Sequence, residues 1–286
     1  MAPSDLDFAQ VVFSGGGTRC FWFGGFLKVV GPAIHLRPRR ICGVSGGALS
    51  AAAFVARRED KLIRVMGEAF ERLDDNVQPH KIAENEGVTP HQKVYRQVVS
   101  ETFDRAATQA VAEGPDFEVL LAHPPSRRFP KLSTFPVMAL YELELALRSN
   151  PHMRWTDALG VRRSLVDARQ AARDGRLVDL ICNAAVIPPV FNIQRWGDEL
   201  CIDGGMTDKA PLPSEDEGRT LVLLTRHFRN PPQSPRRLYV MPSRETPADK
   251  IDFTSREKIE RTWTLGERDG RAFLESHGAT VEETTH

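Results

Sequence analysis

The chain has 286 residues, enough for one large α/β domain or two small ones. Hydrophobic residues make up 41% of it and charged residues 27%, an ordinary globular composition. Lysine plus arginine and aspartate plus glutamate both number 38, so the formal net charge is zero. This balance gives no overall basic charge for nucleic-acid binding.

Two short apolar segments in the N-terminal part predict buried strands, at 8–13 and 40–44. Glycines follow each segment, and a helix is expected after them, at 19–30 and at 48–57. A strand, a sharp turn and a helix are the repeating unit of α/β folds.

The middle of the chain, 58–179, is mostly helical in composition. Amphipathic or helix-forming stretches occur at 61–72, 94–112 and 159–172. The segment 132–140 could form a strand, which Pro136 would restrict to an edge or a bulge. We expect this block to form a helical insertion or cap over a core built from both ends of the chain.

The C-terminal third predicts further short strands and one charged helix. The strands are expected at 199–202, 220–225 and 238–241, and the helix at 255–275. Strands that alternate with helices favour an α/β fold of three layers, with a mainly parallel central sheet and helices on both faces. We expect one domain over residues 1–286, with 58–179 inside it.

Targeting and metal-binding signals are missing from the sequence. The first ten residues lack the basic start and apolar core of a signal peptide, and no stretch reaches 18 uninterrupted apolar residues. A cytoplasmic location is therefore expected, with export without a cleaved signal left open. The four cysteines and eight histidines have no metal-site spacing, so no metal is expected and the cysteines are expected to be free.

The segment Gly43-Val44-Ser45-Gly46-Gly47 fits the G-x-S-x-G pattern of a nucleophile elbow. Such a serine has a strained backbone between a strand and a helix, and its hydroxyl points away from the sheet. Gly43 and Gly47 remove side chains that would collide across the turn, and the following helix offers free N–H groups. The pattern predicts Ser45 as a nucleophile.

A second glycine-rich turn, Gly15-Gly16-Gly17, lies between the first predicted strand and its helix. Unhindered backbone N–H groups of this kind can bind the oxyanion of acyl transfer. A dinucleotide fingerprint starting at Gly15 would need glycine where Cys20 stands, and a Walker loop would need a following Lys-Ser or Lys-Thr. No nucleotide or other cofactor is therefore expected.

A third motif, Asp203-Gly204-Gly205, follows a predicted strand, where α/β folds often place reactive side chains. In this order the three motifs resemble those of the patatin-like phospholipase family. The stretches 183–191 and 208–212 resemble the same family, so the likeness covers about 8–57 and 180–225. Two residues depart from it: Cys20 replaces a common glycine, and Lys209 stands where asparagine is frequent.

The resemblance implies a patatin-like fold and a lipid acyl hydrolase that needs no cofactor. Ser45 would be the nucleophile, Asp203 its base, and Gly15, Gly16 and Gly17 the oxyanion hole. Arg19 would either brace the glycine loop or bind a lipid phosphate. The remaining supporting positions implied by the motifs are Gly43, Gly46, Gly47 and Gly204.

The expected substrate is a phospholipid or lysophospholipid ester, with transient contact to a membrane surface and no nucleic acid. The aromatic run 21–23 would be either a membrane-facing patch or part of the buried face of its helix. Two alternatives stay open: a Ser-Asp-His esterase or thioesterase using His227, and a non-catalytic binding protein with the same fold. The acyl substrate and the oligomeric state are not determined by the sequence.

Overall fold

The computed structural model describes residues 6–74, 90–148, 150–152, 155–188, 190–229, 231–250 and 254–278. Within these residues an eight-stranded sheet has the order β5-β6-β3-β2-β1-β7-β8, and β4 pairs with β3. The strands are β1 (Gln10–Phe13), β2 (Arg40–Val44), β3 (Asp116–His123), β4 (Arg162–Asp167), β5 (Gln194–Trp196), β6 (Glu199–Asp203), β7 (Thr220–Leu223) and β8 (Arg237–Val240).

The strands from β3 to β8 through β2, β1 and β7 are parallel to one another, whereas β4 and β6 run antiparallel to β3. Every residue of β1 and β7 is buried, as expected of parallel strands with both faces covered. The fold is therefore the mainly parallel α/β fold that the sequence predicts.

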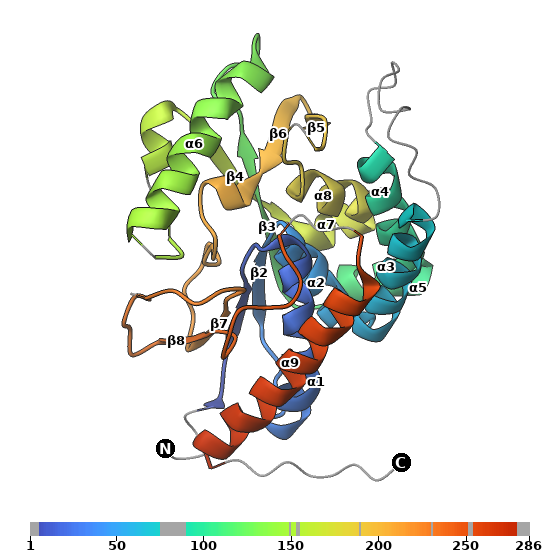
Figure 1. Cartoon of the computed structure of the whole chain (residues 1–286), viewed down its shortest axis with the longest axis vertical. Coiled ribbons are helices and arrows are strands. Elements are labelled where there is room, and N and C mark those ends of the chain that lie inside the picture. Colours follow the sequence, from blue (N-terminus) through green and yellow to red (C-terminus); the bar gives the residue numbers. More distant parts are fainter. Residues whose placement is uncertain are drawn as a thin grey trace.

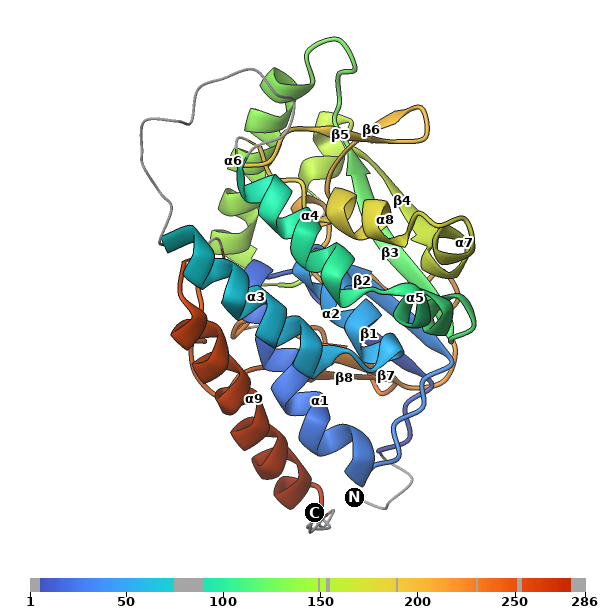
Figure 2. The ribbon, with the colours of Figure 1, turned by 90° about the vertical axis from the view of Figure 1, so that its right-hand side faces the viewer.

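Helices and loops cover both faces of the sheet (Figure 1). The helices are α1 (Phe21–Ala33), α2 (Gly46–Ala56), α3 (Glu59–Asp74), α4 (Pro90–Thr102), α5 (Arg105–Ala112), α6 (Pro130–Arg148), α7 (Ala168–Arg173), α8 (Leu177–Ala184) and α9 (Arg256–Ser276). Figure 2 shows α1, α3, α4 and α9 in front of one face of the sheet. None of the described helices combines the length and apolarity needed to cross a membrane.

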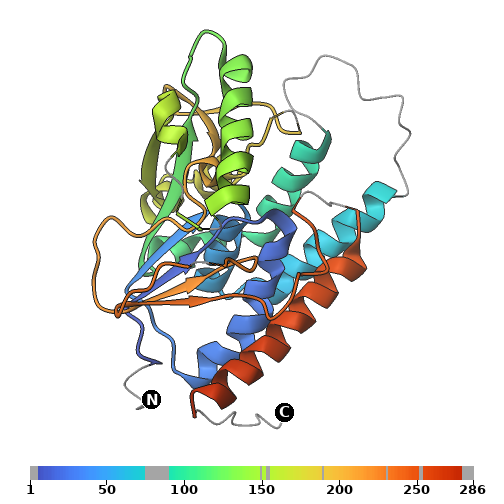
Figure 3. The same cartoon turned by 60° about the vertical axis from the view of Figure 1, so that its left-hand side comes forward.

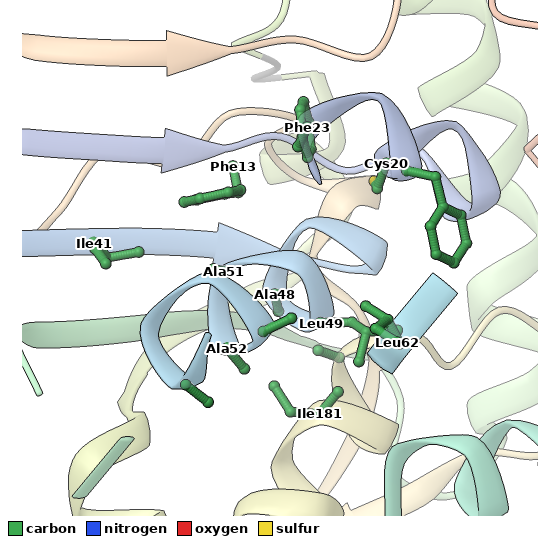
Figure 4. Packing of buried hydrophobic residues seen from close by; sticks show 14 of the residues in the cluster. Phe13, Cys20, Phe23, Ile41, Ala48, Leu49, Ala51, Ala52, Leu62 and Ile181 are labelled. Carbon is green, nitrogen blue, oxygen red and sulfur yellow. The ribbon is translucent and has the colours of Figure 1, made fainter. Parts of the chain in front are cut away.

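Alternate residues of the central strands supply two separate cores. Phe13 and Ile41 face the larger core, where the alanines of α2 allow that helix to lie close to the sheet (Figure 4). Val12 and Cys42 face a smaller core on the opposite side, which includes Tyr141 of α6. Because side chains alternate between the two faces along each strand, α2 packs on one face of the sheet and α6 on the other.

The C-terminal helix α9 lies alongside α1 in every ribbon view (Figure 3). Trp22 stacks on Phe26 with ring centroids 4.8 Å apart, and its indole Nε1 donates to Asp269 Oδ2 at 2.9 Å. All three side chains of the run 21–23 are buried, so this run belongs to the core and forms no membrane-facing patch.

The expected organisation of 58–179 needs correction in three places. This block is mostly helical, but it also supplies β3 and β4, and β3 pairs with β2 in the sheet. The proposed strand at 132–140 lies inside α6, and the proposed helix at 159–172 is helical only from Ala168, in α7, because β4 takes up 162–167. A short apolar run does not distinguish a buried strand from a helix, which accounts for the error at 132–140.

Candidate active site

Ser45 lies between the end of β2 and the start of α2, as the elbow motif predicts. Its φ of 56° and ψ of −135° place a non-glycine residue in a strained backbone conformation. A Cβ at Gly43 would lie 2.8 Å from the Ala48 Cα, and one at Gly47 would collide with the Phe13 and Ser14 carbonyl oxygens. Both positions therefore require glycine for the turn to form.

Asp203 lies next to Ser45 because β2 and β6 both pair with β3. Val44 at the end of β2 pairs with Leu120, and Asp203 at the end of β6 pairs with the next residue, Leu121. β4 occupies the other edge of β3 over this stretch, so β2 and β6 share one edge. Because β2 is parallel and β6 antiparallel to β3, their C-terminal ends face each other.

The two side chains are in direct contact. The Ser45 Oγ donates a hydrogen bond to Asp203 Oδ2 at 2.6 Å, and Asp203 Oδ1 accepts one from the Gly205 N–H at 2.7 Å. Ser45 is 5% exposed and Asp203 3% exposed. A Cβ at Gly204 would collide with the Leu120 carbonyl oxygen, so glycine lets this strand end approach β3.

Burial makes the Asp203 carboxylate a stronger proton acceptor than an exposed one. Desolvation raises the pKa of Asp203, while the Ser45 hydrogen bond and the Lys209 charge lower it in part. Lys209 is also buried, which lowers the pKa of its ammonium group, and the Asp203 charge raises it in part. A buried carboxylate bonded to a serine hydroxyl has the arrangement of a base and its nucleophile.

The glycine loop 15–17 is fixed from two sides. The Gly15 N–H donates to the Lys209 carbonyl at 2.9 Å, and the Thr225 hydroxyl donates to the Gly15 carbonyl at 2.9 Å. Gly16 packs against Thr225, where a Cβ would collide with its side chain, and Gly17 has a φ of +58° and lies against the Lys250 carbonyl. Neither Lys250 nor Thr225 lies in a sequence motif, so their contacts with the glycine loop could not be predicted. The position of Thr225, just after a parallel strand, is the one feature that could have indicated it.

This arrangement reduces the number of backbone N–H groups that are available to bind an oxyanion. The Gly15 N–H is already used by Lys209, contrary to its expected role in the hole. Over the described ranges, no hydrogen-bond acceptor is seen for the N–H groups of Gly16 and Gly17. Gly46, at the N-terminus of α2, is adjacent: its Cβ would lie 2.6 Å from the Gly17 carbonyl oxygen.

Arg19 holds the glycine loop against residues 249–250. Its Nη2 lies 2.8 Å from Asp249 Oδ1, and the neighbouring Thr18 hydroxyl donates to the Asp249 carbonyl. Arg19 and Thr18 therefore both contact Asp249, which precedes the Lys250 carbonyl that packs against Gly17.

An apolar pocket opens beside Ser45. Its walls combine Gly17 and Gly46 with large side chains from α1, α3, α4 and the segment after α8, among them Phe21, Met66, Tyr95 and Phe191. Acyl chains are stabilised by such surfaces. A second, polar pocket borders Gly15 and Gly16.

No histidine bonds to Ser45 or Asp203 within the described part of the chain. His227 is exposed, just beyond β7. The buried His123 bonds to the Leu200 carbonyl and the Ser164 hydroxyl, and His152 contacts Asp208 and Tyr239.

The family model described as "Patatin-like phospholipase" matches residues 11–215. Among solved structures, VipD from Legionella pneumophila is similar, with a TM-score of 0.48 and 11% identity over 95% of this chain and 67% of that chain. Comparison with curated protein sequences finds no match.

The fold and the family match together define the general class of lipid acyl hydrolases. More particularly, the chain belongs to the patatin-like phospholipase family.

Proposed function

We propose that this protein hydrolyses carboxylic esters of lipids, phospholipids or lysophospholipids, through an acyl-enzyme formed on Ser45. The observation that carries the proposal is the 2.6 Å hydrogen bond between Ser45 Oγ and the buried Asp203 carboxylate. The apolar lining of the pocket beside Ser45 supports an acyl chain as the group transferred.

In the first step the Ser45 Oγ attacks the ester carbonyl carbon, and its proton passes to Asp203 Oδ2. The N–H groups of Gly16, Gly17 and Gly46 stabilise the resulting oxyanion, and each such donor contributes about 3 kcal/mol to lowering the barrier. The carbonyl re-forms, the bond to the alcohol breaks, and the alcohol takes the proton from Asp203. The products are a free alcohol and an acyl-Ser45.

In the second step water replaces the alcohol. Asp203 accepts a proton from the water as the water oxygen attacks the acyl carbon. The proton then passes from Asp203 to Ser45 Oγ as the carboxylic acid leaves. The raised pKa of Asp203, caused by its burial, favours both proton transfers near neutral pH. The strained Ser45 backbone keeps the nucleophile in one orientation.

The direct test is covalent labelling combined with turnover. A fluorophosphonate probe should label wild-type protein at Ser45, and a panel of lipid and short acyl esters should be hydrolysed. Ser45→Ala should show neither labelling nor turnover. Labelling at another serine, or full activity in Ser45→Ala, would overturn the proposal.

A further inference from the structure

The polar pocket beside the glycine loop carries an excess of positive charge. Four basic side chains line it, against the two carboxylates of Glu142 and Asp249. The basic residues are Arg19, Lys209, Arg226 and Lys250. The pocket also includes Gly15 and Gly16, so it begins at the loop beside the nucleophile.

Two of the four cations are paired with the two carboxylates. Arg19 lies 2.8 Å from Asp249, and the Lys250 Nζ lies 3.6 Å from Glu142. Within the described part of the chain, neither Lys209 nor Arg226 has a carboxylate at ion-pair distance. Among the residues that line this pocket, Lys209 and Arg226 are therefore the cations without a paired carboxylate, although the charge of Lys209 is partly balanced by the nearby Asp203.

Lys209 is 6% exposed, and its side chain lines the pocket. Its Nζ lies 5.2 Å from the centre of the Tyr141 ring, and no hydrogen bond to its ammonium is seen among the described residues. Burial lowers the pKa of Lys209 most, and the negative charges of Asp203 and Glu142 raise it in part. The positive charge of Arg226 lowers it further, so the two cations repel each other. A buried cation without a full counter-charge is costly, and an anion bound between the two would relieve that cost.

The position of the pocket indicates which part of a substrate could supply this anion. A Cβ at Gly15, which lines the polar pocket, would lie 3.3 Å from the Ser45 Cβ. Lys250 lines both pockets, so the polar and apolar pockets adjoin beside the glycine loop. An ester whose carbonyl is at Ser45 can thus place its acyl chain in the apolar pocket and its alcohol part in the polar one.

We infer that Lys209 and Arg226 bind an anionic head group, so that the enzyme selects lipid esters with a net negative phosphate over zwitterionic or neutral esters. This inference rests on the proposed ester hydrolysis and adds the class of leaving alcohol. Arg226 provides planar donors that suit a phosphate group.

The test compares short-chain lipids as single molecules, below the concentration at which they aggregate, which removes attraction to a charged surface. Dihexanoyl phosphatidate is compared with dihexanoyl phosphatidylcholine and dihexanoyl glycerol, which share its acyl chains. We expect kcat/KM to be at least about tenfold higher for the phosphatidate, equivalent to about 1.4 kcal/mol. Equal values for the three lipids would overturn the inference and leave ester hydrolysis standing.

Two variants test the residues. Arg226→Gln and Lys209→Gln should each bring the phosphatidate-to-phosphatidylcholine ratio close to unity. Arg271→Gln, which removes an exposed arginine on α9, is the matched control and should keep the wild-type ratio. Because Arg226 is only partly buried, its variant keeps the test informative even if the buried Lys209 variant fails to fold. An unchanged ratio in folded Arg226→Gln contradicts the inference.

A binding measurement separates this inference from the proposed function. Calorimetry on Ser45→Ala, which cannot turn over, should show about tenfold tighter binding of the phosphatidate than of the phosphatidylcholine. That result would support the pocket even if wild-type protein hydrolysed none of the esters. If inorganic phosphate binds as tightly as the phosphatidate, the pocket is a general anion site and the head-group assignment is wrong.

Discussion

Ser45 Oγ and Asp203 Oδ2 lie 2.6 Å apart because the strands that end at these residues meet on one edge of β3. The two residues are separated by 158 positions in the chain. Neither local motif contains this contact. It is produced by consecutive positions on β3, since Leu120 pairs with the strand that leads into Ser45 and Leu121 pairs with Asp203 itself.

Removing either member of the pair should remove most of the activity. Asp203→Asn keeps the shape of the side chain but loses the proton acceptor, so turnover should fall by at least about a thousandfold, as it should for Ser45→Ala. The double variant should lose little more than either single variant, because the two residues act as one unit. Additive losses in steady-state hydrolysis would show that they act independently.

His227→Ala decides between a two-residue and a three-residue mechanism. The exposed His227 makes no bond to Ser45 or Asp203 within the described residues, so kcat should stay within about tenfold of wild type. In a triad the histidine carries the proton, and its removal would be as damaging as removing the serine. A collapse of activity in His227→Ala, with an unchanged circular dichroism spectrum, would establish the triad.

Asp203 should also make stability depend on pH. Burial raises its pKa in the folded state above the unfolded value, so its protonation stabilises the protein in acid, and that contribution is lost as the pH rises through the folded pKa. Asp203→Asn, which resembles the neutral form, should therefore melt at a higher temperature than wild type at neutral and alkaline pH. The difference should shrink in acid. For activity the sign is opposite, because only the ionised carboxylate accepts a proton.

Thermal unfolding of both proteins from roughly pH 4 to pH 9 measures this dependence. Asp198→Asn is the control, because Asp198 is exposed and the same chemical change there should give a small difference at every pH. If Asp203→Asn is less stable than wild type above neutral pH, burial does not disfavour the ionised form as described.

The contact between α1 and α9 should depend on glycine. A Cβ at Gly266 would collide with the Trp22 carbonyl oxygen and lie 2.8 Å from the Phe26 nitrogen, so Gly266→Ala should destabilise the protein by about 1–3 kcal/mol. A Cβ at Gly31, in α1, would meet no atom of the described residues within 4 Å, and Gly31→Ala should change stability by less than about 1 kcal/mol. Urea unfolding of the two variants checks this; equal effects would show that the helices can separate at little cost.

The positions of Ser45 and Asp203 could be predicted because their signals are local. Ser45 and Asp203 each sit in a glycine-containing turn after a strand, and the sequence places both there. β3 was not predicted, because it lies in a largely helical stretch. The edge of β3 that brings the two turns together could therefore not be predicted. The use of the Gly15 N–H by Lys209, and the packing of Lys250 against Gly17, depend on residues far away in the chain.

The strand that leads into Ser45 is paired with its neighbours over more residues than β6 is paired with β3. β2 pairs with β3 over five residues and with β1 over four, whereas β6 pairs with β3 only at Ile202 and Asp203. Detaching β6 would thus withdraw Asp203, the proposed base, while Ser45, the proposed nucleophile, stayed on an intact sheet. Such local opening takes less free energy than global unfolding. We expect mild denaturant to abolish ester hydrolysis before the far-ultraviolet circular dichroism changes. Dilution of the denaturant should then restore activity without refolding of the whole chain.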